Sequence, residues 1–483
     1  MDHTKEEFVG ILQDNKRNMT VKQEGQKFQQ YICAFIASIG ALVIGSVLAW
    51  TSPSITYLKD PANYSAPFKL EGENEENMIA AFTPLGAIIG AIPAGIIADT
   101  FGRKLVLIIF TVPWIGTWIL TTFAGSISML YAARFISGII VGLFCAVLPM
   151  YVNEIAENSV RGTLGTLFQV FLTIGILIDY SLGKLNSYLI LNYSIIAISV
   201  AFFVGLFFIP ESPQYLIKKN RKGEAETALR RLRGPTYDVS TELNDLRKRN
   251  ESTAQQKVSF QGLFTKSNVM ALVISIGCML CQQFSGINAV IFFAKSIFED
   301  AKTKDPTMAT IILGIMQTLA TAASSVLVER AGRKILLLIS SVTMGLCLVV
   351  MGYYFWMKDN KVDISEMSWI PIGTMALLII GFSLGLGPLP WMLSGEVLAP
   401  EVKSIGTAAA VTTNWTCVAL VTFFFKPLAN AISAAYTFWL FAMICALSTV
   451  FVLTVVPETK GKSIEEVQQM LGKKPLKSTN GRV

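Results

Sequence analysis

The stretch Gln282-Gln283-Phe284-Ser285-Gly286-Ile287-Asn288 decides how the rest of this chain is interpreted. It lies within an apolar run near residues 268–293, which is long enough to span a bilayer. An unpaired polar group in hydrocarbon costs several kcal/mol, so these amides must face protein, water or a polar solute. Gln282, Ser285 and Asn288 recur at every third position, which predicts that they lie along one side of a helix. We therefore expect this helix to form one wall of a solute pathway.

The composition predicts an all-α polytopic membrane protein. Of 483 residues, 52% are hydrophobic and only 15% are charged, whereas soluble domains carry about 25% charged residues. Apolar runs long enough to cross about 30 Å of hydrocarbon occur twelve times. They lie near 29–51, 78–98, 105–124, 128–151, 161–182, 188–209, 268–293, 308–328, 334–356, 369–395, 404–426 and 435–456.

The distribution of basic residues predicts the orientation. Lys and Arg are concentrated on the side that carries the N-terminus, which indicates that this side is cytoplasmic. The expected organisation is a cytoplasmic tail, a six-helix bundle, a cytoplasmic linker with short helices, a second six-helix bundle and a cytoplasmic tail. These parts cover 1–28, 29–209, 210–266, 267–456 and 457–483. Asn63 begins a sequon in the first outer loop, so we expect it to be available for glycosylation in a plasma-membrane protein.

Several function classes are disfavoured. The only histidine is His3, in a polar N-terminal tail, which argues against histidine catalysis and most metal sites, and no cofactor or enzymatic activity is expected. The basic clusters are interpreted as lipid-facing anchors, not as a nucleic-acid surface. The expected partners are a small polar solute and membrane lipid. The oligomeric state stays open, although a monomer suffices.

The two halves repeat one charge pattern. Arg103 and Arg333 occupy matching loops, Glu154 and Glu396 precede a basic residue at the same spacing, and Pro-Glu motifs close the sixth and twelfth runs. Such a repeat implies two homologous bundles with a pathway between them. We expect a network of charges at the cytoplasmic helix ends whose ion pairs separate when the inner side opens. Its members are Asp99, Arg103, Arg134, Glu154, Arg161, Glu211, Glu329, Arg333, Glu396, Lys403 and Glu458.

These motifs resemble the sugar porters of the major facilitator superfamily, including the facilitative glucose transporters, over about 29–466. Within the family, Trp50-Thr-Ser-Pro53 and the short polar tails look like the insect trehalose-transporter branch. The motifs that carry the resemblance are the Gly95–Lys104 and Glu329–Lys334 loops, Arg134 with Gly138 and Gly142, Pro149–Glu154, Pro210–Pro213, Gln282–Asn288, Gly387–Trp391 and Pro457–Gly461.

The resemblance implies the major facilitator fold and a set of sugar contacts: Gln169, Gln282, Gln283, Asn288 and Trp391. Gln317 stands where glucose carriers have an asparagine, and its amide can still donate and accept hydrogen bonds. Phe292 and Phe293 stand where tyrosines often follow the asparagine, so the identity of the sugar stays open between trehalose and a hexose such as glucose.

Two further features bear on the transport mechanism. Pro388 and Pro390 cannot continue normal helical hydrogen bonding, so we expect a helix break that lets one end move as a gate. The first run has no Asp or Glu, and Asp179 is expected at a water-facing helix end. The sequence therefore favours facilitated diffusion by alternating access. A proton-coupled symporter or a non-transporting sugar sensor on the same scaffold are the alternatives.

Overall fold

The computed structural model describes residues 25–60, 65–70, 72–157, 159–255, 264–399, 402–462 and 464–472, and every regular element there is helical. Eleven helices are long and apolar enough to cross a membrane, or twelve if the bent pair α4–α5 forms one span. This result confirms the fold class and the twelve runs expected from the sequence. Several helices extend beyond the apolar runs, because polar residues outside the hydrocarbon continue the helical hydrogen bonding of the backbone.

The first half contains six spans, several of which are built from two consecutive helices. Its elements are α2 (Phe28–Ala49), α3 (Thr51–Lys59), α4 (Glu73–Ala91), α5 (Ala94–Phe101), α6 (Arg103–Thr122), α7 (Ile127–Ile155), α8 (Arg161–Leu182), the 3₁₀ turn η1 (Gly183–Leu185) and α9 (Tyr188–Phe207). Three short helices follow in the insert, where short helices were expected: α10 (Pro213–Lys218), α11 (Lys222–Arg233) and α12 (Val239–Gln255).

The second half repeats this plan and ends in a short amphipathic helix. Its elements are α13 (Lys266–Phe284), α14 (Ile287–Asp300), α15 (Pro306–Ala331), α16 (Arg333–Asp359), η3 (Ser365–Met367), α17 (Ile370–Leu384), α18 (Leu389–Val397), α19 (Lys403–Ile432), α20 (Ala434–Thr454) and α21 (Ile464–Gly472).

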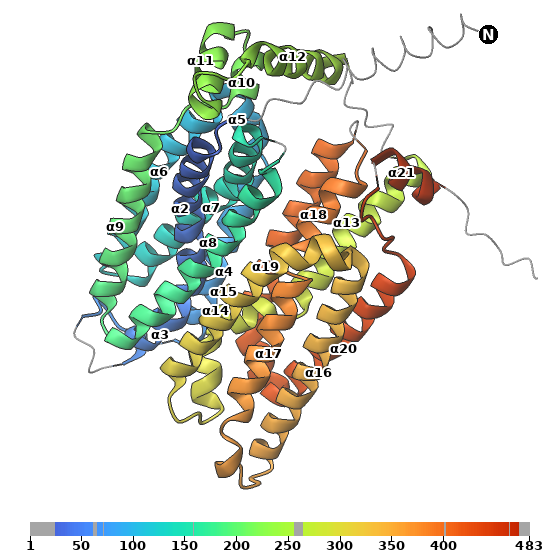
Figure 1. Ribbon diagram of the computed structural model, residues 1–483. Helices are drawn as coiled ribbons and strands as arrows, with labels where there is room; N and C mark the ends of the chain where they lie inside the picture. The colour runs from blue at the N-terminus through green and yellow to red at the C-terminus, as the bar shows by residue number, and fades with distance from the viewer. Residues whose placement is uncertain are drawn as a thin grey trace, which may run out of the picture.

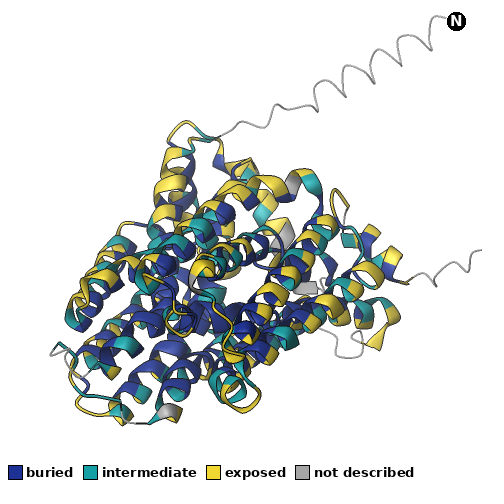
Figure 2. Cartoon of the chain, turned by 90° about the horizontal axis from the view of Figure 1, so that it is seen from below, coloured by how far each residue is buried: buried dark blue, intermediate teal, exposed yellow. Residues whose placement is uncertain are grey.

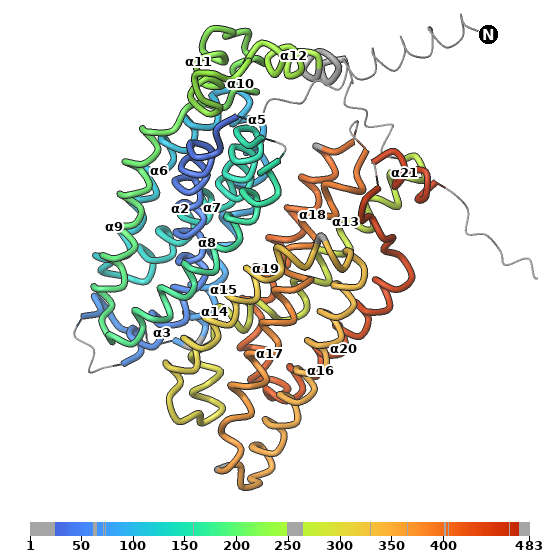
Figure 3. Tube along the Cα trace, viewed as in Figure 1, coloured from blue at the N-terminus to red at the C-terminus, as the bar shows by residue number. Residues whose placement is uncertain are grey.

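The two halves lie side by side, and the insert covers one end of the first half (Figure 1). We call the end with α10–α12 and α21 the insert end, and the opposite end, with α3 and the loop between α16 and α17, the far end. The chain trace crosses repeatedly between these ends in both halves (Figure 3). Each half is therefore a bundle of membrane-length helices joined by short connections.

The burial pattern is that of a protein surrounded by lipid. Buried residues occupy the interior of the molecule, while exposed positions lie on its periphery (Figure 2). Many of these exposed positions carry large apolar side chains, such as Ile96, Leu319 and Leu447. A water-soluble monomer rarely exposes apolar area on this scale, so hydrocarbon is the medium that fits this surface.

Neighbouring helices approach each other closely at glycines, where no side chain separates their backbones. A Cβ atom built on Gly45 would lie 1.9 Å from the carbonyl oxygen of Leu172, and one on Gly90 would lie 1.8 Å from that of Ile139. Only glycine permits such an approach. Without a hydrophobic driving force between helices in lipid, this close packing supplies much of their attraction.

The halves meet through α4 with α19, α8 with α15, and α3 with α14. Hydrogen bonds cross this interface near the far end, where the Tyr180 hydroxyl donates to the Ile291 carbonyl at 2.8 Å and the Lys295 amide donates to Ser52 Oγ at 3.1 Å. Helices α13 and α18, in contrast, make their extensive contacts with elements of their own half. The halves are therefore joined most firmly toward the far end.

Candidate functional site

A break in the seventh span organises the candidate site. Helix α13 ends at Phe284, and Gly286 precedes α14 with a φ of +83°, a conformation that favours glycine. A Cβ at this position would also lie 2.7 Å from the ring of Phe441. The sequence prediction that Gln282, Ser285 and Asn288 share one side of a single helix is therefore wrong, because the helix is interrupted at Ser285 and Gly286.

The Gln282 side chain connects this break to a second one. Its Nε2 donates to the carbonyl oxygens of Leu386 at 2.6 Å and Gly387 at 2.7 Å, in the gap between α17 and α18. Its Oε1 accepts from Asn414 Nδ2 at 2.7 Å and from Gln283 Nε2 at 3.1 Å. Gln282 is 2% exposed, and its amide makes four hydrogen bonds within the protein. In this conformation it holds two broken helices together.

The amide chain continues from Gln282 toward α14. Asn288 Nδ2 donates to Gln283 Oε1, and both side chains are buried. The Oδ1 atoms of Asn288 and Asn414 accept no hydrogen bond from the described residues, and one N–H of Gln283 is likewise unused. These groups can therefore form hydrogen bonds with a polar solute.

Two further glutamines lie on the pair of helices that joins the halves. Gln317 is on α15 and is 2% exposed, and its buried Oε1 has no hydrogen-bond partner among the described residues. Gln169 is on α8, which packs against α15, and it is half-buried. A buried acceptor without a partner is costly, so Gln317 is a site where a solute hydroxyl would be stabilised.

The tenth span is broken next to Trp391. Helix α17 ends at Leu384 and α18 begins at Leu389, and Pro388 and Pro390 lie at the start of α18. Pro388 has no N–H, and the carbonyls freed by the break at Leu386 and Gly387 are the two that Gln282 binds. Trp391, in the first turn of α18, is 38% exposed.

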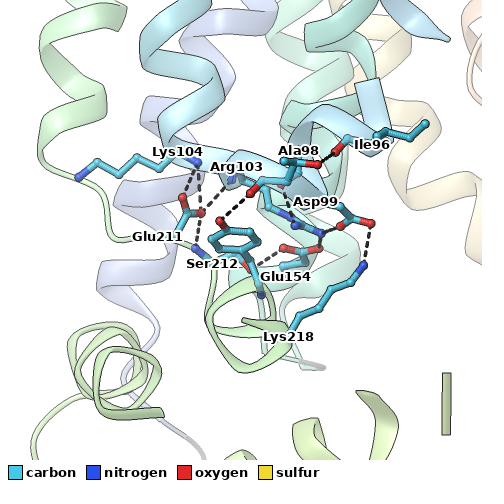
Figure 4. A network of polar contacts seen from close by, with 11 residues as sticks. Ile96, Ala98, Asp99, Arg103, Lys104, Glu154, Glu211, Ser212 and Lys218 are labelled. Carbon is cyan, nitrogen blue, oxygen red and sulfur yellow. Dashed lines mark hydrogen bonds and ion pairs between the residues drawn. The ribbon is translucent and has the colours of Figure 1, made fainter. Parts of the chain in front are cut away.

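A charge network ties the insert end of the first half together (Figure 4). Arg103 Nη2 contacts Glu154 Oε1 at 2.7 Å and Asp99 Oδ1 at 3.0 Å. Glu211 accepts hydrogen bonds from the backbone amides of Arg103 at 3.0 Å and Lys104 at 3.1 Å. These carboxylates thus neutralise the first turn of α6 and fix it to α7.

The second half contains the same network at matching positions. Arg333 Nη2 contacts Glu396 Oε1 at 2.9 Å, and Glu458 accepts from the amides of Arg333 and Lys334. Partial burial acts to raise the pKa of Glu458, but its backbone amide donors outweigh that effect and hold the pKa below its usual value. The repeat seen in the sequence is thus a repeat of structure.

Both networks join helices of one half only. They are intact although α13 and α18, at the insert end, pack mainly within their own half. In this conformation each network therefore stabilises its own half, and the separation of its ion pairs when the inner side opens stays a prediction. Arg161 and Lys403 donate to the carbonyls of Ala156 and Gly395, also within their own halves.

Arg134 does not belong to the network at the insert end. It is 1% exposed near the start of α7, where its guanidinium donates to the Val47 carbonyl and Thr51 Oγ1 and lies over the Trp50 ring. These residues lie where α2 meets α3, toward the far end. The expectation that Arg134 belongs to this network was wrong, because α7 places it about five and a half turns away from Glu154.

Asp179 is also placed differently from the expectation. It is fully buried on α8 instead of facing water, and the Ser46 hydroxyl lies close to its carboxylate. Arg134 is close enough for its charge to act on this carboxylate. The Glu329 side chain and Asn63 lie outside the described residues.

Asn414 is the site residue that sequence reasoning missed. The signal that could have revealed it is an amide in the middle of an apolar run, which indicates a polar contact. On α19 it is 2% exposed and binds Gln282. Its position shows that α13 and α19 both contribute amides to the site.

An apolar groove of about 530 Å³ lies on the other side of α13, between α13 and α20. It is lined by side chains such as Leu280, Phe284 and Phe451, with Ser448 as a polar exception. Such a surface fits hydrocarbon chains and not a hydroxylated solute, so it does not compete with the amide cluster as a sugar site.

Comparisons with known proteins agree with this architecture. The family model for "Sugar (and other) transporter" matches residues 33–471. A facilitated trehalose transporter Tret1 from Polypedilum vanderplanki is 39% identical over 453 residues, which cover 92% of this chain and 89% of that protein. One from Bombyx mori is 36% identical, with coverage of 95% and 90%.

Solved structures extend the comparison to the fold. The proton:xylose symporter XylE bound to 6-bromo-6-deoxy-D-glucose has a TM-score of 0.74 at 23% identity, over 92% of this chain and 99% of that chain. An inward open conformation of the xylose transporter XylE from E. coli also gives 0.74 at 23% identity, over 90% and 98%. With its helices, its repeat and these relatives taken together, the chain belongs to the sugar transporter family and has the major facilitator fold.

Proposed function

We propose that this protein is a facilitative transporter of trehalose or of a hexose such as glucose. The main evidence is the cluster of uncharged amides at the two helix breaks. The unused hydrogen-bond acceptors of this cluster, the Oδ1 atoms of Asn288 and Asn414, lie on α14 and α19. Relatives that share more than a third of the sequence are named facilitated trehalose transporters, which supports the substrate class. A transporter family and an amide-lined site favour translocation over catalysis.

The proposed contacts follow from the chemistry of a sugar. The Oδ1 atoms of Asn288 and Asn414 accept from hydroxyls, the unused N–H of Gln283 donates, and the unpartnered Oε1 of Gln317 accepts. Trp391 offers an aromatic ring to the apolar face of the sugar. Gln169 would contribute from the first half, so most of the polar contacts come from the second half.

Alternating access follows from the way the halves meet. The insert end, which carries most of the basic residues, is proposed to be cytoplasmic in the plasma membrane, with both termini on that side. In this conformation the firm contacts between the halves lie toward the far end. We therefore assign it as the state that is open to the cytoplasm and closed to the outside.

Tracer uptake of trehalose and of glucose in oocytes that express the protein tests this proposal. We expect saturable uptake that equilibrates without accumulation, inhibited by the other sugar if both share the site. Asn288→Ala should raise the KM, because it removes a direct sugar contact. A protein that reaches the surface but transports neither sugar would contradict the proposal and would favour a sensor.

Proton-coupled symport is a second candidate, and Asp179 is the observation that favours it. A carboxylate this deeply buried, with Arg134 as a nearby charge, can carry a proton through the membrane interior. If symport operates, an inward proton gradient should drive accumulation, and Asp179→Asn should abolish the accumulation but not exchange. If uptake is facilitative, the gradient has no effect on the final distribution.

A further inference from the structure

A buried carboxylate at the far end contacts lysines from both halves. Glu76, in the first turns of α4, is 1% exposed. It forms ion pairs with Lys59 on α3 and with Lys426 on α19. Lys59 belongs to the same half as Glu76, whereas Lys426 belongs to the other half. This cluster therefore joins the two halves by charge, unlike the networks at the insert end.

Lys426 also connects this cluster to the helix that carries the sugar site. Its ammonium lies 5.4 Å from the centre of the Phe293 ring, and Phe293 stacks on Phe425 at 5.6 Å. Phe293 lies in α14, where its backbone departs from helical geometry, and Asn288 lies in the first turn of the same helix. Lys426 and Phe293 belong to the same half, so this contact couples the lysine of the cluster to α14.

The lysines remain accessible from the far end. A polar cavity of about 300 Å³ is lined by Lys59 and Lys426 together with Asp60, Glu299 and Asp300. Water can therefore hydrate both ammonium groups when the cluster separates, and the acidic side chains offer other partners to Lys426. The carboxylate of Glu76 is enclosed, so it depends on its lysines for compensation.

We propose that the Glu76–Lys426 ion pair is the latch that holds the far end of the pathway closed. Lys59 is the counter-charge that stays with Glu76 when the latch opens. This inference rests on the proposed function for the identity of the far end as the outer side. Opening requires α4 and α19 to separate, which breaks the contact with Lys426 but leaves Lys59 on the same half as Glu76.

The two lysines are therefore expected to have different effects. Loss of Lys426 removes an interaction that exists only in the closed state, so it shifts the equilibrium toward the outward-open state. Loss of Lys59 removes the partner that Glu76 keeps in both states, so the closed state, with Lys426 still in place, becomes relatively more favourable. A purely structural role would give both substitutions the same sign.

The test measures labelling of a reporter cysteine by a membrane-impermeant maleimide on intact cells, without sugar. Ser52→Cys places the reporter at the buried contact between α3 and the amide of Lys295. In this background, Lys426→Gln should increase the labelling rate about five- to tenfold, which is the lower end of the range for one coupling interaction. Glu76→Gln should also increase it, and Lys59→Gln should leave it unchanged or slower.

Two controls and two outcomes decide the matter. Lys358→Gln, which alters a far-end lysine that donates within its own half to the Asp300 carbonyl, should label like the reporter alone. Lys426→Arg should restore slow labelling because it keeps the charge. Unchanged labelling in Lys426→Gln at normal surface density, or equal increases in Lys59→Gln and Lys426→Gln, would overturn the proposal. Because labelling needs no substrate, failure to transport trehalose or glucose would leave this result intact.

Discussion

Replacing Gln282 with alanine should destabilise the protein as well as impair transport. The substitution removes four hydrogen bonds and leaves the Asn414 amide and the carbonyls of Leu386 and Gly387 without their partner. Each buried polar group left unpaired costs about 1–3 kcal/mol, and water that enters the site offsets part of this cost. We therefore expect a loss of about 2–4 kcal/mol in unfolding free energy.

Asn288→Ala is the informative comparison. It removes a single hydrogen bond within the protein, to Gln283, so its structural cost should be about 1 kcal/mol. Its main effect should be a higher KM, because the free Oδ1 is a proposed sugar contact. Asn360→Ala serves as a control. It removes one exposed hydrogen bond from the Asn360 amide to the Trp356 carbonyl, so it should change neither the stability nor the KM appreciably.

The assay combines thermal unfolding of the purified protein with sugar uptake normalised to surface density. The reasoning predicts a clear ordering of Tm, with Gln282→Ala lowest and Asn288→Ala close to the unaltered protein. If Gln282→Ala raised only the KM and left the Tm unchanged, Gln282 would be a sugar ligand and not the joint between the two helix breaks. If both variants lowered the Tm by the same amount, the difference expected from their hydrogen bonds would be refuted.

Three further predictions follow from the backbone and the charge networks. Gly286→Ala should cost about 1–3 kcal/mol in stability and most of the uptake, because φ is positive and the added Cβ meets Phe441; Gly95→Ala, where a Cβ meets nothing within 4 Å, should be tolerated. Arg103→Ala combined with Arg333→Ala should lower the Tm and the transport rate while the protein still reaches the surface, and unchanged flux would refute a role for both networks. Folding lowers the pKa of Glu458, so this carboxylate stabilises the protein above its unfolded pKa, and that stabilisation is lost as pH falls through the folded pKa. The Tm measured at decreasing pH should therefore drop in this acidic range, and Glu458→Gln should make that drop smaller.

Much of the fold could be predicted because the membrane imposes strong local rules. A span needs a long apolar run and complete backbone hydrogen bonding, so the runs and the paired motifs around Arg103 and Arg333 predict helices and a repeat directly. The positions of the amides at Gln282, Gln283 and Asn288 likewise predict a polar site, because such side chains are rare in hydrocarbon.

The errors arose where a long-range contact decides the outcome. Helical periodicity assumes an unbroken helix, but the positive φ at Gly286 and its contact with Phe441 separate Gln282 from Asn288. Arg134 and Asp179 were misplaced because the sequence shows each charge without its surroundings, and both are enclosed by other helices.

Composition and local pattern were sufficient to predict the class of protein, the repeat and the presence of a polar cluster in the seventh span. The tertiary structure alone decided what the cluster does. It joined Gln282 to Asn414 and to the broken tenth span, and it brought Lys426 to Glu76 across the two halves. These contacts connect residues far apart in the chain, and no local periodicity encodes which distant partner a buried polar group finds.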